Sequence, residues 1–226
     1  MKIRWLPLRF LPAIFLLPAV SGCLGPQVQS TEDYGPLGPQ SDRARGEQRV
    51  LVVAAGFPDA NPDFSLERIK RKAVKGLSRY VREQSYGLTW VNPDFRGAVM
   101  LPEPISEYKV SPYNFRVDRT RVRKLIEDVM TSLEGDVDFS GYDHLLIIPW
   151  VTTRPGKGYG MICYCANPGM LSGVRRDVAF VTVASKKGRK FNGGIFVAAE
   201  NAHLGMFAHD FFHALGGIEG NRRLVP

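Results

Sequence analysis

Apolar runs alternate along this chain with segments whose apolar residues recur at helical spacing. Continuous apolar runs, typical of strands buried on both faces, occupy residues 50–55 and 144–150. Shorter strands are predicted at 88–91, 98–101, 177–184 and 195–198. Spacings of three and four residues predict amphipathic helices over about 65–83, 118–133 and 202–215. This alternation predicts an α/β (α+β layered) fold with a mixed twisted sheet.

Three breaks in the pattern complete this prediction. Asn92-Pro93-Asp94 is expected to join two separate strands as a loop, and the Gly-rich stretch 156–173 is expected to lack regular structure. Glu200 and Asn201 are expected to begin the final helix, with Asn201 as its N-cap.

The first 22 residues do not fit a folded domain. Three basic residues precede an apolar stretch, 11–20, that is too short to span a bilayer. Val20-Ser21-Gly22-Cys23 resembles the lipobox of bacterial lipoprotein signal peptides, in which the cysteine is lipidated after cleavage. The resemblance implies export to the bacterial cell envelope, with a lipid anchor at Cys23 in the outer membrane or at the cell surface. An ordinary secretory signal with a chance cysteine is the alternative.

We therefore divide the chain into three parts. Residues 1–22 form a signal peptide, and 23–48, rich in Gly, Pro, Gln and Ser, read as a flexible tether. Residues 49–226 are long enough for one domain with its own core. Removing the three basic residues of the leader lowers the formal net charge from +8 to +5. That surplus is too moderate to argue for a nucleic-acid partner.

The first predicted helix carries a basic stripe opposite its apolar face, formed by Lys70, Arg71, Lys72, Lys75, Arg79 and Arg82. The stripe is either a binding surface or, as is more usual, a solvated helix face.

Two cysteines remain in the mature domain, in the sequence Cys163-Tyr164-Cys165. A disulfide across one intervening residue closes a small strained ring. Two thiols alone also make a poor zinc site. A local disulfide and two free thiols both stay open.

The last predicted helix contains His209-Asp210-Phe211-Phe212-His213. Two histidines four residues apart share one helix face, so their imidazoles can converge on one metal ion. An acid directly after the first histidine can accept a proton from a metal-activated water. After the helix, Gly216 allows a sharp turn that can bring Glu219 back as a third ligand. Two buried histidines with ordinary hydrogen bonds are the alternative, and His144, His203, Tyr159 and Tyr164 are weaker candidates.

Residues 209–219 resemble the zinc motif of the immune inhibitor A-type secreted metallopeptidases and their gametolysin-like relatives, His-Glu-x-x-His-x-x-Gly-x-x-Asp or a closing His. The strand and loop at 50–59 and the segment Glu83-Gln84-Ser85-Tyr86-Gly87-Leu88 also look like parts of that family. The resemblance implies a zincin/metzincin-like N-terminal subdomain that ends in the metal-binding helix. It also implies that His209, His213 and Glu219 bind Zn²⁺, that Asp210 is the general base, and that the substrate is a protein or peptide.

Three departures from the family pattern bear on activity. Asp210 is one methylene shorter than Glu, so its carboxylate falls short of the usual water position by about 1.5 Å, and a misplacement near 1 Å can cost around 10²-fold in rate. Glu219 replaces the family's Asp or His and needs a different backbone path. The relatives continue into a C-terminal subdomain, which we expect to be missing because this chain ends at Pro226.

Three functions follow as expectations. The first is a zinc-dependent metallopeptidase-like lipoprotein that hydrolyses peptide bonds. The second is a catalytically weakened or inactive truncated relative that acts as an envelope-associated binding module. The third is a structural lipoprotein without metal.

Overall fold

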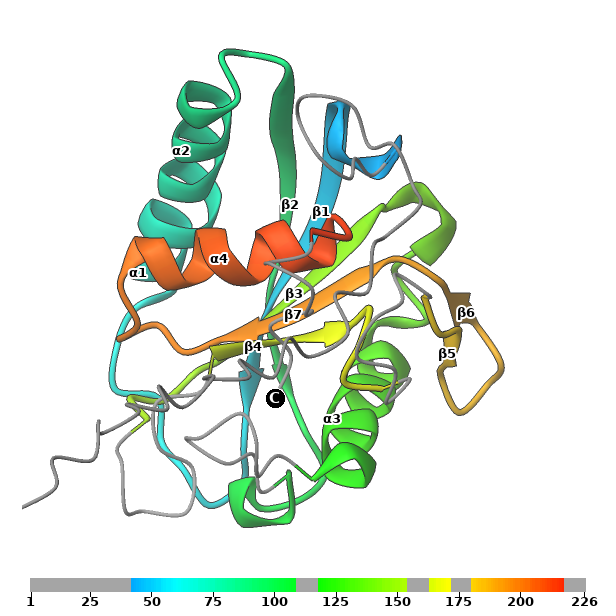
Figure 1. Cartoon of the computed structure of the whole chain (residues 1–226). Coiled ribbons are helices and arrows are strands. Elements are labelled where there is room, and N and C mark those ends of the chain that lie inside the picture. The colour runs from blue at the N-terminus through cyan, green and yellow to red at the C-terminus, as the bar shows by residue number, and fades with distance from the viewer. Residues whose placement is uncertain (1–41, 109–117, 154–162, 172–179, 218–226) are drawn as a thin grey trace, which may run out of the picture.

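The computed structural model describes residues 42–108, 118–153, 163–171 and 180–217, which form a layered α/β fold (Figure 1). Its centre is a five-stranded sheet in the order β2-β1-β3-β7-β4. The four strands from β2 to β7 are parallel, and β4 runs antiparallel to β7 at the edge. A mixed sheet with helices was the predicted class, and it is confirmed.

The bounds of the elements are as follows. The sheet contains β1 (Gly46–Gly56), β2 (Thr89–Met100), β3 (His144–Pro149), β4 (Cys163–Asn167) and β7 (Gly194–Ala198). A separate two-stranded hairpin pairs β5 (Val183–Ala184) with β6 (Lys190–Phe191). The helices are α1 (Leu66–Ile69), a π-helical segment (Lys70–Gly76), α2 (Leu77–Gln84), α3 (Arg119–Leu133) and α4 (Leu204–Ala214). Short 3-10 turns cover Asp42–Ala44, Ile105–Tyr108 and Phe139–Gly141.

Strand β1 is buried on both faces, as its continuous apolar run predicts. Val50, Val52 and Ala54 pack with α2 and α4 on one side. Leu51 and Val53 pack with α3 on the other side. The sheet is therefore the middle layer, with α1, α2 and α4 covering one face and α3 the opposite face (Figure 1). Each described helix is too short or too polar to cross a bilayer.

The structure corrects several predicted boundaries. Residues 89–100 form one continuous strand rather than two, because Pro93 lies in the edge strand β2, where a missing backbone N–H is tolerated. Residues 163–167, expected to lack regular structure, form β4. In the predicted strand 177–184 the described pairing is limited to Val183–Ala184. Strand β1 begins at Gly46, within the stretch expected to be tether.

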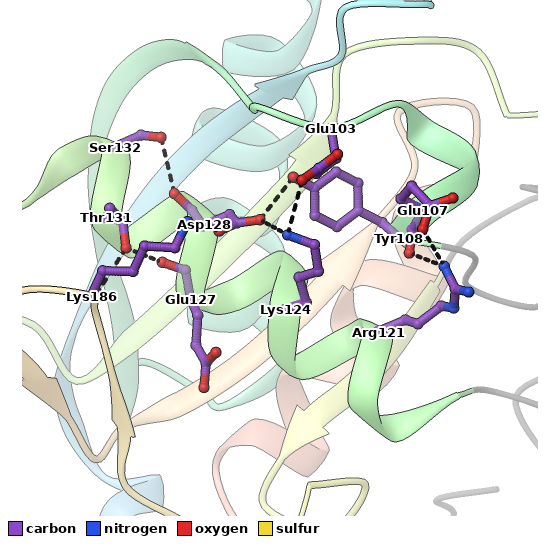
Figure 2. Close-up of polar contacts among 10 residues, drawn as sticks. All are labelled: Glu103, Glu107, Tyr108, Arg121, Lys124, Glu127, Asp128, Thr131, Ser132 and Lys186. Carbon is purple, nitrogen blue, oxygen red and sulfur yellow. Dashed lines mark hydrogen bonds and ion pairs between the residues drawn. The ribbon is translucent and has the colours of Figure 1, made fainter.

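The outer helix α3 is tied to the fold by a buried carboxylate. Asp118 caps the helix, accepting hydrogen bonds from the backbone N–H groups of Thr120 and Arg121. One turn before the end, the Asp128 carboxylate lies between Tyr108, whose hydroxyl donates at 2.9 Å, and Lys124, whose Nζ lies at 2.7 Å (Figure 2). The other carboxylate oxygen of Asp128 pairs with Lys186, from the turn between β5 and β6, at 3.1 Å.

The surroundings of Asp128 favour its charged form. Burial by itself would raise the pKa of this carboxyl, but hydrogen bonds from Lys124, Lys186 and Tyr108 outweigh burial and hold the pKa below its ordinary value. A carboxylate whose folded pKa is depressed stabilises the fold above its unfolded pKa, and that contribution is lost as pH falls through the folded value.

We predict that Asp128→Asn lowers the free energy of unfolding by about 2–4 kcal/mol at neutral pH, because two lysines lose a buried partner. The deficit should begin to shrink as the pH falls below about 4, the unfolded pKa of an aspartate, and should be lost only below the depressed folded pKa, where the folded parent is itself protonated. Urea unfolding followed by circular dichroism measures both. Glu127→Gln on the same helix is the control, because its pair with Arg123 is long and half-exposed; we expect a change below about 0.5 kcal/mol there. An equal loss at all pH values would contradict the electrostatic explanation.

Candidate metal centre

Helix α4 carries the predicted metal motif and is anchored by aromatic residues. Phe207 and Phe211 are buried against the sheet, and the Phe211 ring lies 5.6 Å from the ring of Phe196 on β7. Close approach of the helix end to β7 requires Gly194, because a Cβ there would lie 2.6 Å from the carbonyl oxygen of Ala214. The helix orientation is thereby fixed, and with it the directions in which the motif residues point.

The two motif histidines meet through their Nε2 atoms. His209 Nε2 and His213 Nε2 are 3.2 Å apart, with the rings edge to face. Two imidazole nitrogens bound to one tetrahedral zinc at 2.0–2.1 Å would be separated by about 3.3 Å. The pair is therefore spaced as two ligands of a single ion require, which confirms that the i, i+4 spacing brings the rings together.

The backbone after α4 orients the ring of His213. Its Nδ1 lies 3.0 Å from the carbonyl oxygen of Gly217. A carbonyl only accepts, so Nδ1 carries the proton and Nε2 of the neutral ring presents a lone pair. Gly216 makes this possible, since its φ of 93° turns the chain back over the helix end. A histidine with its second nitrogen held by a carbonyl is the usual outer-shell arrangement of a metal ligand.

The donor set of this pair suits zinc, for which imidazole is a common ligand. Within the described ranges, no third His, Cys, Asp or Glu completes a metal-binding group with it. Glu219, the expected third ligand, lies outside the described residues, as does the lipidation candidate Cys23.

Asp210 points in another direction from the imidazoles. Its side chain is buried, and Oδ2 accepts a hydrogen bond from the thiol of Cys163 on β4, with Sγ at 2.7 Å. Burial raises the pKa of Asp210 to about 6, although the Cys163 hydrogen bond, the neighbouring His209 and a backbone hydrogen bond from Cys165 act in the opposite direction. The expected general base is thus next to His209 in sequence but bonded to the edge strand.

Cys163 and Cys165 are buried and are not joined by a disulfide, so the structure matches the second of the two predicted states, two thiols. Alternation along β4 turns both toward α4, while Tyr164 faces the other side of the sheet. Burial, followed by the nearby Asp210 charge, raises the pKa of Cys163 well above its ordinary value. The sequence analysis missed this contact; the Cys-x-Cys alternation was the only signal, since it marks a strand with both sulfurs on one face.

The corner before α4 is also different from the prediction. The helix begins at Leu204, with His203 in the N-cap position, rather than at Glu200 or Asn201. Glu200 is instead a buried ion-pair partner of Arg68 at 2.7 Å and Lys72 at 3.1 Å. Asn201 donates from its amide to the backbone oxygen of Thr153 at 2.8 Å. These long-range bonds, which no local pattern reveals, hold the corner in place.

His209 lies at the wall of a hollow of about 540 Å³ between α2 and α4. Apolar side chains dominate this wall, among them Tyr80, Val81, Phe212 and Leu215. His209 itself is exposed, whereas His213 is 1% exposed. Within the described part of the chain, the pair is therefore open to solvent on the His209 side.

The weaker histidine candidates lie elsewhere. His144 is buried in β3, and its Nε2 is 2.7 Å from the amide oxygen of Gln48; burial lowers its pKa to about 4. It is a neutral core residue in contact with Phe211. His203 is exposed at the start of α4. Tyr164 lies in β4 with a fully buried hydroxyl, and Tyr159 falls outside the described residues.

Comparison of the sequence with known proteins finds no matching family model and no curated protein of significant similarity.

Proposed function

We propose that this protein is a zinc-dependent metallopeptidase-like lipoprotein of the bacterial cell envelope, exported and anchored through Cys23. The observation that carries the proposal is the 3.2 Å separation of the two Nε2 atoms of His209 and His213. The hydrogen bond from His213 to Gly217 supports it, because that bond leaves the Nε2 lone pair available. The mixed sheet that leads into α4 is also compatible with the zincin-like subdomain that the sequence motif implies.

In this proposal each residue has a separate task. His209 and His213 would hold the ion, and Glu219 is proposed as its third ligand. Bound zinc supplies a Lewis acid that lowers the pKa of a water molecule and polarises a peptide carbonyl. Asp210 would accept the proton. Its pKa near 6 supports this role, because the carboxylate is then ionised at neutral pH yet basic enough to be protonated.

A second candidate is a weakened or inactive relative that acts as a binding module. The observation that favours it is the Cys163 thiol bonded to Asp210. A carboxylate held by the edge strand is both shorter than Glu and turned away from the proposed ion. Zinc would then stabilise the fold or a binding surface rather than drive hydrolysis.

Zinc binding tests the assignment shared by both candidates. We expect about one zinc per chain in metal analysis and a saturable isotherm in calorimetry. His209→Ala and His213→Ala should each weaken binding by more than the roughly 10–100-fold cost of losing an outer-shell partner. His203→Ala, at the exposed start of the same helix, is the matched control and should bind zinc like the parent. If the parent gains no zinc, or if the control loses as much affinity as the other two, the site assignment fails.

Substitution of Asp210 separates the two candidates once zinc is bound. For a peptidase, hydrolysis of labelled casein should be abolished by chelation and by Asp210→Asn. Asp210→Glu should raise the rate by up to about 10²-fold, because the longer arm reaches the water position. Zinc content measured on every variant serves as the control. Zinc-loaded parent and Asp210→Glu that are both inactive would contradict the peptidase and favour the binding module.

A further inference from the structure

Exposed bulky apolar side chains lie on the turn between α2 and β2 and at the start of β2. Tyr86 is 95% exposed, Leu88 66% and Trp90 39%. We call these three residues the apolar tip. Tyr86 also has a φ of 53°, a left-handed conformation that a large side chain rarely adopts, and Gly87 follows with a φ of 78°. Clusters of exposed apolar side chains and strained backbone conformations are both enriched at interaction sites.

Positive charge lies next to the apolar tip. Residues 66–84 contain seven basic and two acidic side chains. Three of the seven form ion pairs of 3.1 Å or less: Arg68 and Lys72 pair with Glu200, and Lys70 pairs with Glu67. The other four are exposed, and they are Arg71, Lys75, Arg79 and Arg82.

The turn itself places this charge at the base of the tip. The backbone N–H of Gly87 donates to the carbonyl oxygen of Arg82 at 2.8 Å, so Arg82 adjoins Tyr86 and Leu88. Arg79 lies 3.9 Å from Glu83, a long and exposed contact that leaves its charge available. Two residues of the basic stripe, Lys70 and Lys72, therefore pair within the fold. The four exposed cations run along the helical segment toward the tip, with Arg79 and Arg82 in its last turns.

The chain that leads from Cys23 enters the domain at the same place. The Gly46 N–H donates to the carbonyl oxygen of Leu88 at 2.9 Å, and Gly46 is paired with Thr89 in the sheet. Arg43 precedes this point, but its guanidinium stacks on the ring of Phe180 at 3.9 Å and donates to the carbonyl oxygen of Asn192, so it is not counted with the tip. A membrane anchor at Cys23 would thus be joined to the domain beside the apolar tip.

We propose that the apolar tip and its four cations form a docking surface for an anionic lipid bilayer. Tyr, Trp and Leu side chains partition into the interfacial region of a bilayer, while Arg and Lys bind the lipid phosphates. The occupant is inferred from charge complementarity and from the entry point of the tether. Ser85 and Thr89, at the base of the tip, also line the hollow beside His209, so docking holds that hollow close to the membrane surface.

Depth-dependent quenching of Trp90 tests this proposal on the lipid-anchored protein, residues 23–226, and so rests on the anchor proposed at Cys23. Trp150→Phe leaves Trp90 as the single tryptophan of the protein from Cys23 onward, because Trp5 lies in the proposed signal peptide. The protein is reconstituted in phosphatidylcholine vesicles with brominated acyl chains, with or without phosphatidylglycerol. We expect strong Trp90 quenching that requires the anionic lipid. Arg79→Gln with Arg82→Gln should weaken docking about 25-fold, since each cation near an anionic surface contributes roughly fivefold. Leu88→Ser should reduce quenching as well.

Two control variants match these changes on other surfaces. Met100→Ser removes an apolar side chain that is 57% exposed at the far end of β2. Arg119→Gln with Arg123→Gln removes two cations from α3, on the opposite face of the sheet. In both variants Trp90 should be quenched as in the parent.

Quenching that is equal in neutral and anionic vesicles, or that survives loss of Arg79 and Arg82, overturns the proposal. Absence of quenching in every vesicle also overturns it and leaves the tip to a protein partner. Trp90 quenching does not depend on zinc, so the docking proposal and the proposed zinc site can fail independently of each other.

Discussion

The arrangement of the candidate centre depends on the packing of α4 against β7 and β4. Phe207 and Phe211 fill the space between helix and sheet, and Gly194 lets the end of the helix come close to β7. The face of α4 that carries these phenylalanines must therefore be buried. The helical period then determines whether each other side chain points toward the sheet or toward solvent. His209 is left exposed, His213 is enclosed, and Asp210 is turned toward the sheet. Core packing thus sets which way each motif residue points, and the hydrogen bonds of His213 with Gly217 and of Asp210 with Cys163 then fix the orientation of their side chains.

Because of this packing, the Asp210 carboxylate does not lie where the sequence motif would place it. Its place in the motif sets it beside the imidazoles, whereas packing sets its carboxylate against the thiol of Cys163. A buried carboxylate must be hydrogen-bonded, and the thiol meets that need without supplying a positive charge. The pKa near 6 is the consequence of this compromise. The pKa of Asp210 therefore suits proton transfer, whereas the position of its carboxylate opposes it. For this reason the contact between Asp210 and Cys163 supports both the peptidase and the binding module as candidate functions.

Local sequence patterns predicted the elements that are determined locally. The apolar run of β1 and the helical spacing over 118–133 gave correct elements, because burial on both faces of a strand and the apolar period of a helix are visible in a few consecutive residues. The prediction of two strands in place of β2 was wrong because Pro93 was interpreted as a turn signal. Proline is tolerated in an edge strand, and whether a strand lies at the edge depends on the whole sheet. At the site, the spacing of His209 and His213 predicted their convergence. The Cys163–Asp210 bond and the Glu200 ion pairs join residues more than 45 positions apart, and no periodicity encodes such contacts.

The central claim is that His209 and His213 bind one zinc ion, and that the sulfur of Cys163 is hydrogen-bonded to Asp210 and is not a ligand of the metal. X-ray absorption at the zinc edge of the stoichiometrically loaded protein tests it most directly. The account predicts a first shell of nitrogen and oxygen near 2.0–2.1 Å with the outer-shell scattering of two imidazoles. A sulfur shell near 2.3 Å would contradict it, because Cys163 or Cys165 would then be a ligand in place of a histidine.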